Sequence, residues 1–205
     1  MTLTPAFADA LQFMCEHHGD QVRKDLAGTP YVAHLMSVAA LVMEHGGNED
    51  DGIAGLLHDT IEDAGGVEIE AVIAERFGPE VARIVRAVSD TDQMPKPPWR
   101  ERKQAYLDHL ATADLRALRV SAADKLHNAR ALYADYVRDG EVLWDRFSAG
   151  REDQLWIYGE YGAAFERRLA ELGQSEGSTA ELVATLQLTV AQLAEAVAAS
   201  GAAGR

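Results

Sequence analysis

The feature of this sequence that most constrains its fold is the run from Leu56 to Asp63, in which a leucine pair precedes a His-Asp pair and two further carboxylates follow. At 3.6 residues per turn, Glu62 lies one helical turn after His58, and Asp63 one turn after Asp59. The leucines draw this turn into a core, where neighbouring like charges are costly unless a cation neutralises them. An imidazole beside carboxylates suits a divalent first-row metal such as Mn, Fe or Zn. The sequence therefore predicts half of a metal site, which other elements must complete.

Helical patterns dominate the rest of the chain. Apolar residues recur with a period near 3.6, strand signals are nearly absent, and glycine or proline marks most of the breaks. We therefore expect an all-α fold. The predicted helices cover residues 4–18, 30–45, 49–63, 67–77, 79–88, 99–110 and 113–136, one or two helices after 140, and 179–199. The proline-rich stretch 89–98 is predicted to be a long, constrained loop of the kind that often carries function.

The helical pattern divides the chain into a main domain and a C-terminal extension. We expect one compact helical domain over residues 1–172, a linker over 173–178, an amphipathic helix over 179–199 and a disordered tail over 200–205. Apolar steps of three and four residues give that helix a short coiled-coil seam, made of Val183, Leu186, Val190, Leu193 and Val197. The seam could pair two copies, dock on its own domain or fray, and we favour a homodimer through this helix.

Composition places the protein among intracellular globular proteins. A chain of 205 residues with 47% hydrophobic and 25% charged residues can bury a full core. The formal charge of −14 argues against broad binding to a nucleic-acid polymer or an anionic membrane, because both need a basic face. The single Cys15, expected to be buried, excludes an intrachain disulfide. We find no leader and no apolar run of the ~20 residues that span a bilayer, so we expect a cytoplasmic protein.

Two other predicted helices carry residues that can complete the metal site. His34 lies in the second helix and Asp124 in the long helix over 113–136. Together with His58 and Asp59 they supply two nitrogens and at least two oxygens, which leaves positions open for water and substrate, as in catalytic rather than structural sites. We expect Lys125 to point away from Asp124, because adjacent helical residues do not face each other.

Glu62 and Asp63 are the candidate catalytic carboxylates. Each lies one turn from a predicted metal ligand, so Glu62 can orient or deprotonate a water held at the site, and Asp63 can assist it. A solvated acidic helix end is the alternative, but the leucine pair favours the metal site. We assign His18 to the surface and the aromatic segment 144–165 mainly to the core.

Several segments together resemble a known enzyme family. The order His34, His58-Asp59, Asp124 is similar to that of the HD-superfamily metal-dependent phosphohydrolases. The closer resemblance is to the hydrolase domain of RelA/SpoT-type enzymes and to the stand-alone small alarmone hydrolases. It is carried by five segments in the family's order: Arg23-Lys24-Asp25 with Gly28-Thr29-Pro30-Tyr31 and His34, then His58-Asp59-Thr60-Ile61-Glu62-Asp63, Phe77-Gly78, Met94-Pro95-Lys96, and Ala123-Asp124-Lys125-Leu126-His127-Asn128.

The resemblance implies an HD-type helical domain that holds Mn²⁺ on the four residues above and removes the 3′-pyrophosphate from guanosine tetra- or pentaphosphate, the alarmone of the stringent response. It also implies that Arg23 and Lys24 contact the purine, that Lys96 holds phosphates and that Asn128 lies near the ribose and base. Guanidinium planes stack on purines, and a loop lysine can bind a polyphosphate as a point charge. Two alternatives stay open, namely a phosphohydrolase for other nucleotides, such as adenine alarmones or nucleoside monophosphates, and a catalytically idle nucleotide-binding regulator.

Overall fold

The computed structural model describes residues 2–25, 27–91 and 95–203, and this part of the chain is helical apart from its loops and one isolated antiparallel bridge between Val22 and Pro30. The predicted all-α fold is confirmed. Met94 lies outside the described residues. The elements are α1 (Pro5–His18), α2 (Tyr31–Glu44), α3 (Glu49–Leu57), α4 (Thr60–Ala64), α5 (Gly66–Phe77), α6 (Pro79–Val88), α7 (Trp99–Leu110), α8 (Leu115–Asp139), the 3-10 helix η1 (Gly140–Arg146), α9 (Arg151–Glu171) and α10 (Ser178–Ala203).

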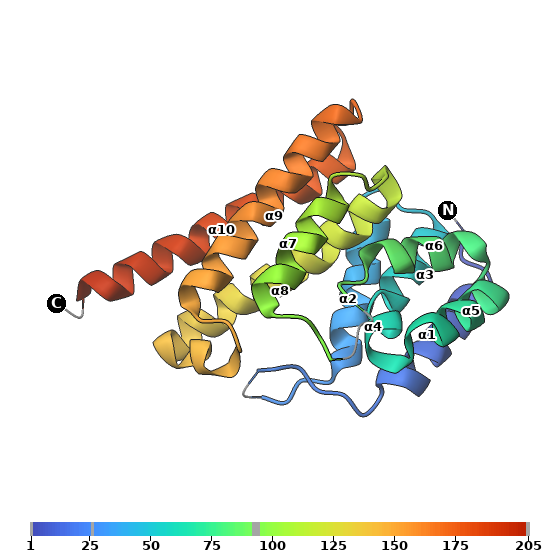
Figure 1. Ribbon diagram of the computed structural model, residues 1–205, viewed down its shortest axis with the longest axis horizontal. Helices are drawn as coiled ribbons and strands as arrows, with labels where there is room; N and C mark the ends of the chain where they lie inside the picture. Colours follow the sequence, from blue (N-terminus) through green and yellow to red (C-terminus); the bar gives the residue numbers. More distant parts are fainter. Residues whose placement is uncertain (1, 26, 92–94, 204–205) are drawn as a thin grey trace.

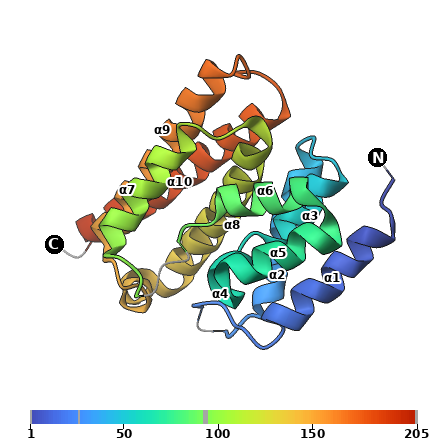
Figure 2. The ribbon, with the colours of Figure 1, turned by 45° about the vertical axis from the view of Figure 1, so that its right-hand side comes forward.

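Helix α8 is the central element (Figures 1 and 2). The elements α1 to α6 gather on one side of it, and α7, α9 and α10 lie on the other. α8 contacts α2, α3 and α6 as well as α9 and α10. Its middle is accordingly buried all round, with Val120, Ala122, Ala123 and Leu126 each fully enclosed. A residue in the middle of α8 can therefore face residues from both groups of helices.

A close approach between α2 and α3 sets the spacing of the two helices that lead to the predicted histidines. Gly55 of α3 packs against Ala39 of α2, and a Cβ at Gly55 would lie 2.9 Å from the Ala39 Cα and 3.2 Å from its nitrogen. Carbon atoms in contact normally lie about 3.5–4.0 Å apart. Only glycine fits here without moving a helix.

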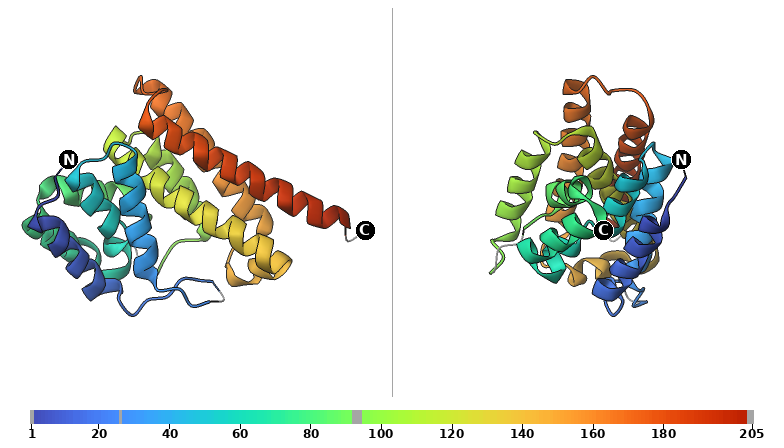
Figure 3. Two further views of the ribbon diagram at one scale, coloured as in Figure 1. Left: turned by 180° about the vertical axis from the view of Figure 1, so that it is seen from behind. Right: turned by 90° about the vertical axis from the view of Figure 1, so that its right-hand side faces the viewer.

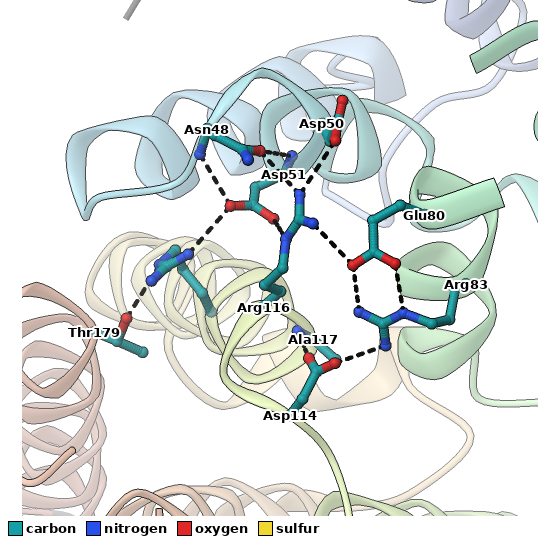
Figure 4. Close-up of polar contacts among 10 residues, drawn as sticks. Asn48, Asp50, Asp51, Glu80, Arg83, Asp114, Arg116, Ala117 and Thr179 are labelled. Atoms are coloured by element: carbon teal, nitrogen blue, oxygen red, sulfur yellow. Dashed lines mark hydrogen bonds and ion pairs between the residues drawn. The ribbon is translucent and has the colours of Figure 1, made fainter. Parts of the chain in front are cut away.

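A buried ion-pair network fixes α8 against α3 and α10 (Figure 4). Asp51, only 2% exposed, accepts a hydrogen bond of 2.5 Å from Arg116 Nε and one of 3.2 Å from Arg119 Nη1. Arg119 also donates to Thr179 Oγ1 at 3.1 Å, which brings the start of α10 into the network. Because Asp51 also completes the capping box of α3 with Asn48, one carboxylate holds three helices.

Helix α10 runs along α8, as Figure 3 shows from behind. Its apolar seam is covered by α8, α9 and η1 of the same chain, where Leu186 and Leu193 are fully buried. The seam therefore docks on its own domain, one of the three outcomes that its spacing allows, and the homodimer through this helix stays a prediction. The helix also continues to Ala203, beyond the tail expected from residue 200.

By length and composition, α10 could cross a membrane. The stretch Ser178–Ser200 has a mean hydropathy of 1.5, with 33% of its most apolar part buried inside the fold. The expectation that no apolar run approaches the length that spans a bilayer is therefore wrong. Core helices of proteins outside membranes meet the same criterion, and the apolar seam of α10 packs against α8 and α9.

Two side chains of α1 differ in burial from the prediction. Cys15 is exposed, whereas His18 is fully buried. His18 Nδ1 lies 2.9 Å from Gln21 Oε1 and its Nε2 lies 3.2 Å from Thr60 Oγ1. The imidazole therefore joins the loop after α1 to the start of α4.

Candidate active site

The structure brings all four predicted metal ligands together. His34 comes from the first turn of α2, His58 and Asp59 from the turn between α3 and α4, and Asp124 from the middle of α8. His58 Nε2 lies 3.1 Å from Asp59 Oδ2, and His34 Nε2 lies 3.2 Å from Asp124 Oδ1. The crossed pairs are His58 to Asp124 at 3.7 Å and His34 to Asp59 at 4.0 Å. Four donor atoms from three helical segments thus surround one small volume.

His34, His58 and Asp59 offer ligand atoms that all lie within 4.8 Å of one another, as a divalent cation requires, and Asp124 faces both histidines beside them. Ligand nitrogens and oxygens lie about 2.0–2.2 Å from a metal such as zinc, so two ligands of one ion lie no more than about 4.4 Å apart. His58 Nδ1 lies 2.9 Å from the Gly55 carbonyl, to which it donates, while His58 Nε2 is buried and has no hydrogen-bond partner in the part of the chain that the structure describes. An imidazole with its outer nitrogen fixed and its inner nitrogen free is the usual form of a metal-ligating histidine.

His127 orients His34, as the Gly55 carbonyl orients His58. His127 Nδ1 lies 2.8 Å from His34 Nδ1. Burial, with the nearby charges of His34 and Arg23, lowers the pKa of His127 to about 4. At neutral pH His127 is therefore uncharged and can accept the Nδ1 proton of His34, which leaves His34 Nε2 facing the carboxylates.

The electrostatics of the site favour positive charge between the carboxylates. Burial acts to lower the pKa of His58, but Asp59 and Asp124 outweigh it and raise that pKa well above its usual value. Burial acts to raise the pKa of Asp124, but Lys125 and the two histidines hold it well below the usual range. The carboxylates therefore stay ionised, as metal binding requires.

Three side chains orient the two aspartates, and one of them, Asn128, is also a predicted substrate contact. Tyr31 donates its hydroxyl to Asp59 Oδ2, and burial together with the charge of Asp59 raises the tyrosine's pKa, so the hydroxyl keeps its proton. Asn128 Nδ2 donates to Asp124 Oδ1 at 2.5 Å, and Lys125 Nζ donates to Asp124 Oδ2 at 2.6 Å. The prediction that Lys125 points away from Asp124 is wrong. Its flexible chain folds back to the neighbouring carboxylate.

Packing explains why Lys125 adopts this position. Its ammonium lies 4.7 Å from the centre of the Tyr106 ring and 5.2 Å from that of Tyr161. The faces of these rings attract a cation in a site that holds little water. The rings come from α7 and α9, so their position could not be inferred from the spacing within α8.

The candidate catalytic carboxylates lie on α4 beside the metal ligands. Glu62 Oε1 lies 2.8 Å from Lys96 Nζ, so the structure brings this lysine to the water-activating candidate. Loss of hydration where the Asp63 carboxyl lines a cavity, with the charges of Asp59 and Glu62, raises the pKa of Asp63. Asp63 is more exposed than Glu62, and unlike Glu62 it does not line the cavity that contains Asp59 and Asp124.

Two adjoining cavities open over the site. One, of about 470 Å³, reaches Asp59 and Asp124. The other, of about 670 Å³, is lined by Arg23 and Asp63. Both volumes are in the range of small-molecule sites. The residues that line both are Lys24, Tyr31, Glu62, Lys96, Asn128, Phe147 and Tyr158. All four predicted substrate-binding residues therefore lie at these cavities, including Arg23, whose Nη2 donates to Asn128 Oδ1 at 2.9 Å.

The wall of the first cavity also contains residues that no sequence signal had singled out. Arg102 and Lys103 of α7 both donate to Asp90 Oδ2, at 2.6 and 2.8 Å. Phe147 and Tyr158 line both cavities, whereas Trp144 and Phe165 of the same aromatic segment are buried in the core. Only the fold separates cavity-lining aromatics from core aromatics, since both follow helical spacing.

Comparison with known proteins agrees with this geometry. A family model described as HD domain matches residues 10–155, a range that contains every residue predicted for the site. The MESH1 protein of Xenopus tropicalis, named guanosine-3′,5′-bis(diphosphate) 3′-pyrophosphohydrolase, is 39% identical over 126 residues, which are 60% of this chain and 68% of that protein. The human protein of the same name is 36% identical over 126 residues, with the same coverage.

The fold has a match among solved structures. A structure described as a metazoan ortholog of SpoT that hydrolyses ppGpp superimposes with a TM-score of 0.73 at 26% identity. The match covers 94% of this chain and 97% of that one. The similarity therefore extends over the cavities and over α10 as well as the segments that carry the motifs.

Proposed function

We propose that this chain, which belongs to the HD domain family, is a metal-dependent guanosine-3′,5′-bis(diphosphate) 3′-pyrophosphohydrolase. It adds water across the ester bond between the ribose O3′ and the first phosphorus of the 3′-diphosphate, and it releases GDP and pyrophosphate. The observation that carries the proposal is the convergence of His34, His58, Asp59 and Asp124 at the floor of a cavity with basic walls. Similarity to enzymes named for this activity supports the choice of substrate.

The metal would be held by His34, His58, Asp59 and Asp124, and we propose Mn²⁺ as the ion, because imidazole and carboxylate donors in this number suit it. When bound, the ion supplies Lewis acidity, which polarises phosphoryl oxygens and makes water a better nucleophile. The chain's own contribution is to fix the donors. Tyr31 and Asn128 hold the carboxylates, and the Gly55 carbonyl fixes the His58 ring.

Glu62 is the proposed general base. It accepts a proton from the attacking water, while Asp63, whose raised pKa lets it carry a proton nearer neutral pH, assists the transfer. Glu62 then passes this proton on to the ester oxygen O3′ as the phosphorus–oxygen bond breaks, so that atoms and charge balance. Glu62 lines the cavity that also contains Asp59 and Asp124, which keeps these groups within the reach of one substrate.

The nucleotide would lie across both cavities. Lys96 lines each of them beside Glu62 and is placed to bind the phosphates of the arm that is cleaved. Arg23 and Lys24 line the cavity of about 670 Å³, where a guanidinium can stack on a purine. Asn128, between Arg23 and Asp124, is the proposed contact to the ribose. We also propose a cytoplasmic location, which the single cysteine supports.

Product analysis tests the proposal. Protein supplied with Mn²⁺ and ppGpp should release GDP and pyrophosphate in equal amounts, and a chelator should stop the reaction. Glu62→Gln should retain the metal and lose about 10²- to 10⁴-fold in rate if Glu62 is the base. Glu75→Gln, on the exposed part of α5, is the matched control and should change neither. Cleavage of another nucleotide in place of ppGpp would reject the proposed substrate. Binding of ppGpp without turnover would reject the proposed enzymatic activity.

A further inference from the structure

We infer that the Lys96–Glu62 ion pair couples substrate binding to catalysis. Lys96 forms an ion pair with the proposed general base, Glu62, and keeps it from accepting a proton until a diphosphate binds Lys96 instead. The inference rests on the proposed function, and it concerns when Glu62 becomes available. It also gives Lys96 a second role, as a positioning residue for Glu62, in addition to holding phosphate.

The contact joins two separate parts of the chain. Glu62 comes from α4, and Lys96 comes from the proline-rich segment that leads into α7. Lys96 Nζ lies 2.8 Å from Glu62 Oε1, with side-chain exposures of 39% and 19%. Over residues 2–25, 27–91 and 95–203, this is the one hydrogen bond that either side chain makes. Each side chain therefore has the other as its hydrogen-bonded partner.

The other carboxylates of the site are held differently. Asp59 receives a hydrogen bond from Tyr31, and Asp124 receives hydrogen bonds from Asn128 and Lys125. Those donors belong to packed helices. The donor to Glu62 is a half-exposed lysine on a loop that lines both cavities, so a ligand in either cavity can reach it.

A diphosphate competes well for this ammonium. Its oxygens carry more charge than one carboxylate, and hydrogen bonds between charged groups strengthen with that charge. The ion pair is partly solvated, so breaking it costs only about a two- to fivefold loss of ligand affinity. When Lys96 moves to the phosphate, Glu62 Oε1 is free to accept the proton of a water. Small phosphoesters without a second anionic group leave the pair intact and are turned over slowly.

Opposite effects on two substrates test the inference. Lys96→Ala and Lys96→Gln should lower kcat/KM for ppGpp by about ten- to a hundredfold, because a charged hydrogen bond to substrate is lost. The same variants should raise the hydrolysis of bis(p-nitrophenyl) phosphate, a singly charged diester, by about two- to fivefold. Lys24→Ala is the matched control, since Lys24 lines both cavities but, among the described residues, makes no hydrogen bond or ion pair with Glu62. It should lower the ppGpp rate without raising the diester rate.

A binding cycle tests the same inference without turnover. Calorimetry at a fixed free Mn²⁺ concentration would measure the affinity for imidodiphosphate, an uncleavable diphosphate. When Lys96 is present, Glu62→Gln should increase the affinity for imidodiphosphate, because the lysine no longer has to leave Glu62. This increase should exceed the one measured in the Lys96→Ala background by about two- to fivefold. Equal gains in both backgrounds, or parallel losses on both substrates in the Lys96 variants, would overturn the inference. Failure of the wild type to cleave ppGpp would instead overturn the proposed function, and the binding cycle would still decide the role of the ion pair.

Discussion

The contact between Gly55 and Ala39 gives a prediction that joins packing to function. In Gly55→Ala, the new methyl group would lie 2.9 Å from the Ala39 Cα, so α2 and α3 must separate by roughly 0.6 Å to restore normal carbon contacts. Overpacking of this kind costs about 1–3 kcal/mol. Alanine also gains about 0.8–1.0 kcal/mol over glycine in a helix, so the net loss of unfolding free energy should be about 0–2 kcal/mol.

A second glycine separates these two terms. Gly159 lies within α9, and no heavy atom comes within 4 Å of a Cβ built there. Gly159→Ala should therefore gain the helix propensity without the clash, and it should stabilise the protein by up to about 1 kcal/mol. The difference between the two variants, about 1–3 kcal/mol, is the cost of the contact itself. Urea unfolding followed by circular dichroism measures both.

The Gly55→Ala variant should also disturb the metal site. Ala39 follows His34 on α2, and Gly55 precedes His58 at the end of α3, so separating the helices separates the two imidazoles. A misplacement of 1 Å can cost on the order of 10²-fold in rate, so a shift of roughly 0.6 Å should cost on the order of tenfold. Gly159→Ala should keep the wild-type rate. A Gly55→Ala protein as stable and as active as Gly159→Ala would refute this reasoning.

Three further predictions concern other parts of the fold. Asp51→Ala, which leaves Arg116 and Arg119 without their shared carboxylate, should lower the unfolding free energy by about 3–5 kcal/mol in a urea titration. Hydrogen bonding from Arg83, with the charge of Arg116, lowers the pKa of Glu80 to about 2. The ionised Glu80 carboxylate therefore contributes its full share of the unfolding free energy above about pH 4.5, and this contribution is lost as pH falls toward 2. Glu80→Gln should cost less than about 1 kcal/mol at pH 7 and should flatten the stability profile over that acid range. Tyr31→Phe, which removes the hydroxyl that holds Asp59, should weaken Mn²⁺ binding by about 10- to 100-fold in a calorimetric titration, and undiminished affinity would contradict that role.

The sequence was informative wherever a function depends on spacing along one helix. Asp124 with Asn128 follows from a one-turn spacing on α8, whereas the helix predicted over 49–63 is interrupted by a turn at His58 and Asp59 that separates them from Glu62 on α4. Each of these residues lies at the site as expected. The all-α fold follows from the same periodicity, because apolar faces of helices must pack on one another.

The sequence was silent where a contact joins separate elements. Lys125 reaches Asp124 because rings from α7 and α9 draw its ammonium inward, and His18 is buried because Gln21 and Thr60 pair with it. The seam of α10 has coiled-coil spacing, but the spacing does not say which surface covers it. These contacts depend on where other helices pack, which local patterns do not determine.

The most direct test of the central claim is the number of Mn²⁺ ions bound per chain, measured by electron paramagnetic resonance of free Mn²⁺ during a titration. The wild type should bind one ion tightly. Asp124→Ala and His58→Ala, checked for native helix content, should each lose that ion. Wild-type binding by either variant would contradict the claim that helices α2, α3 and α8 meet to hold one cation.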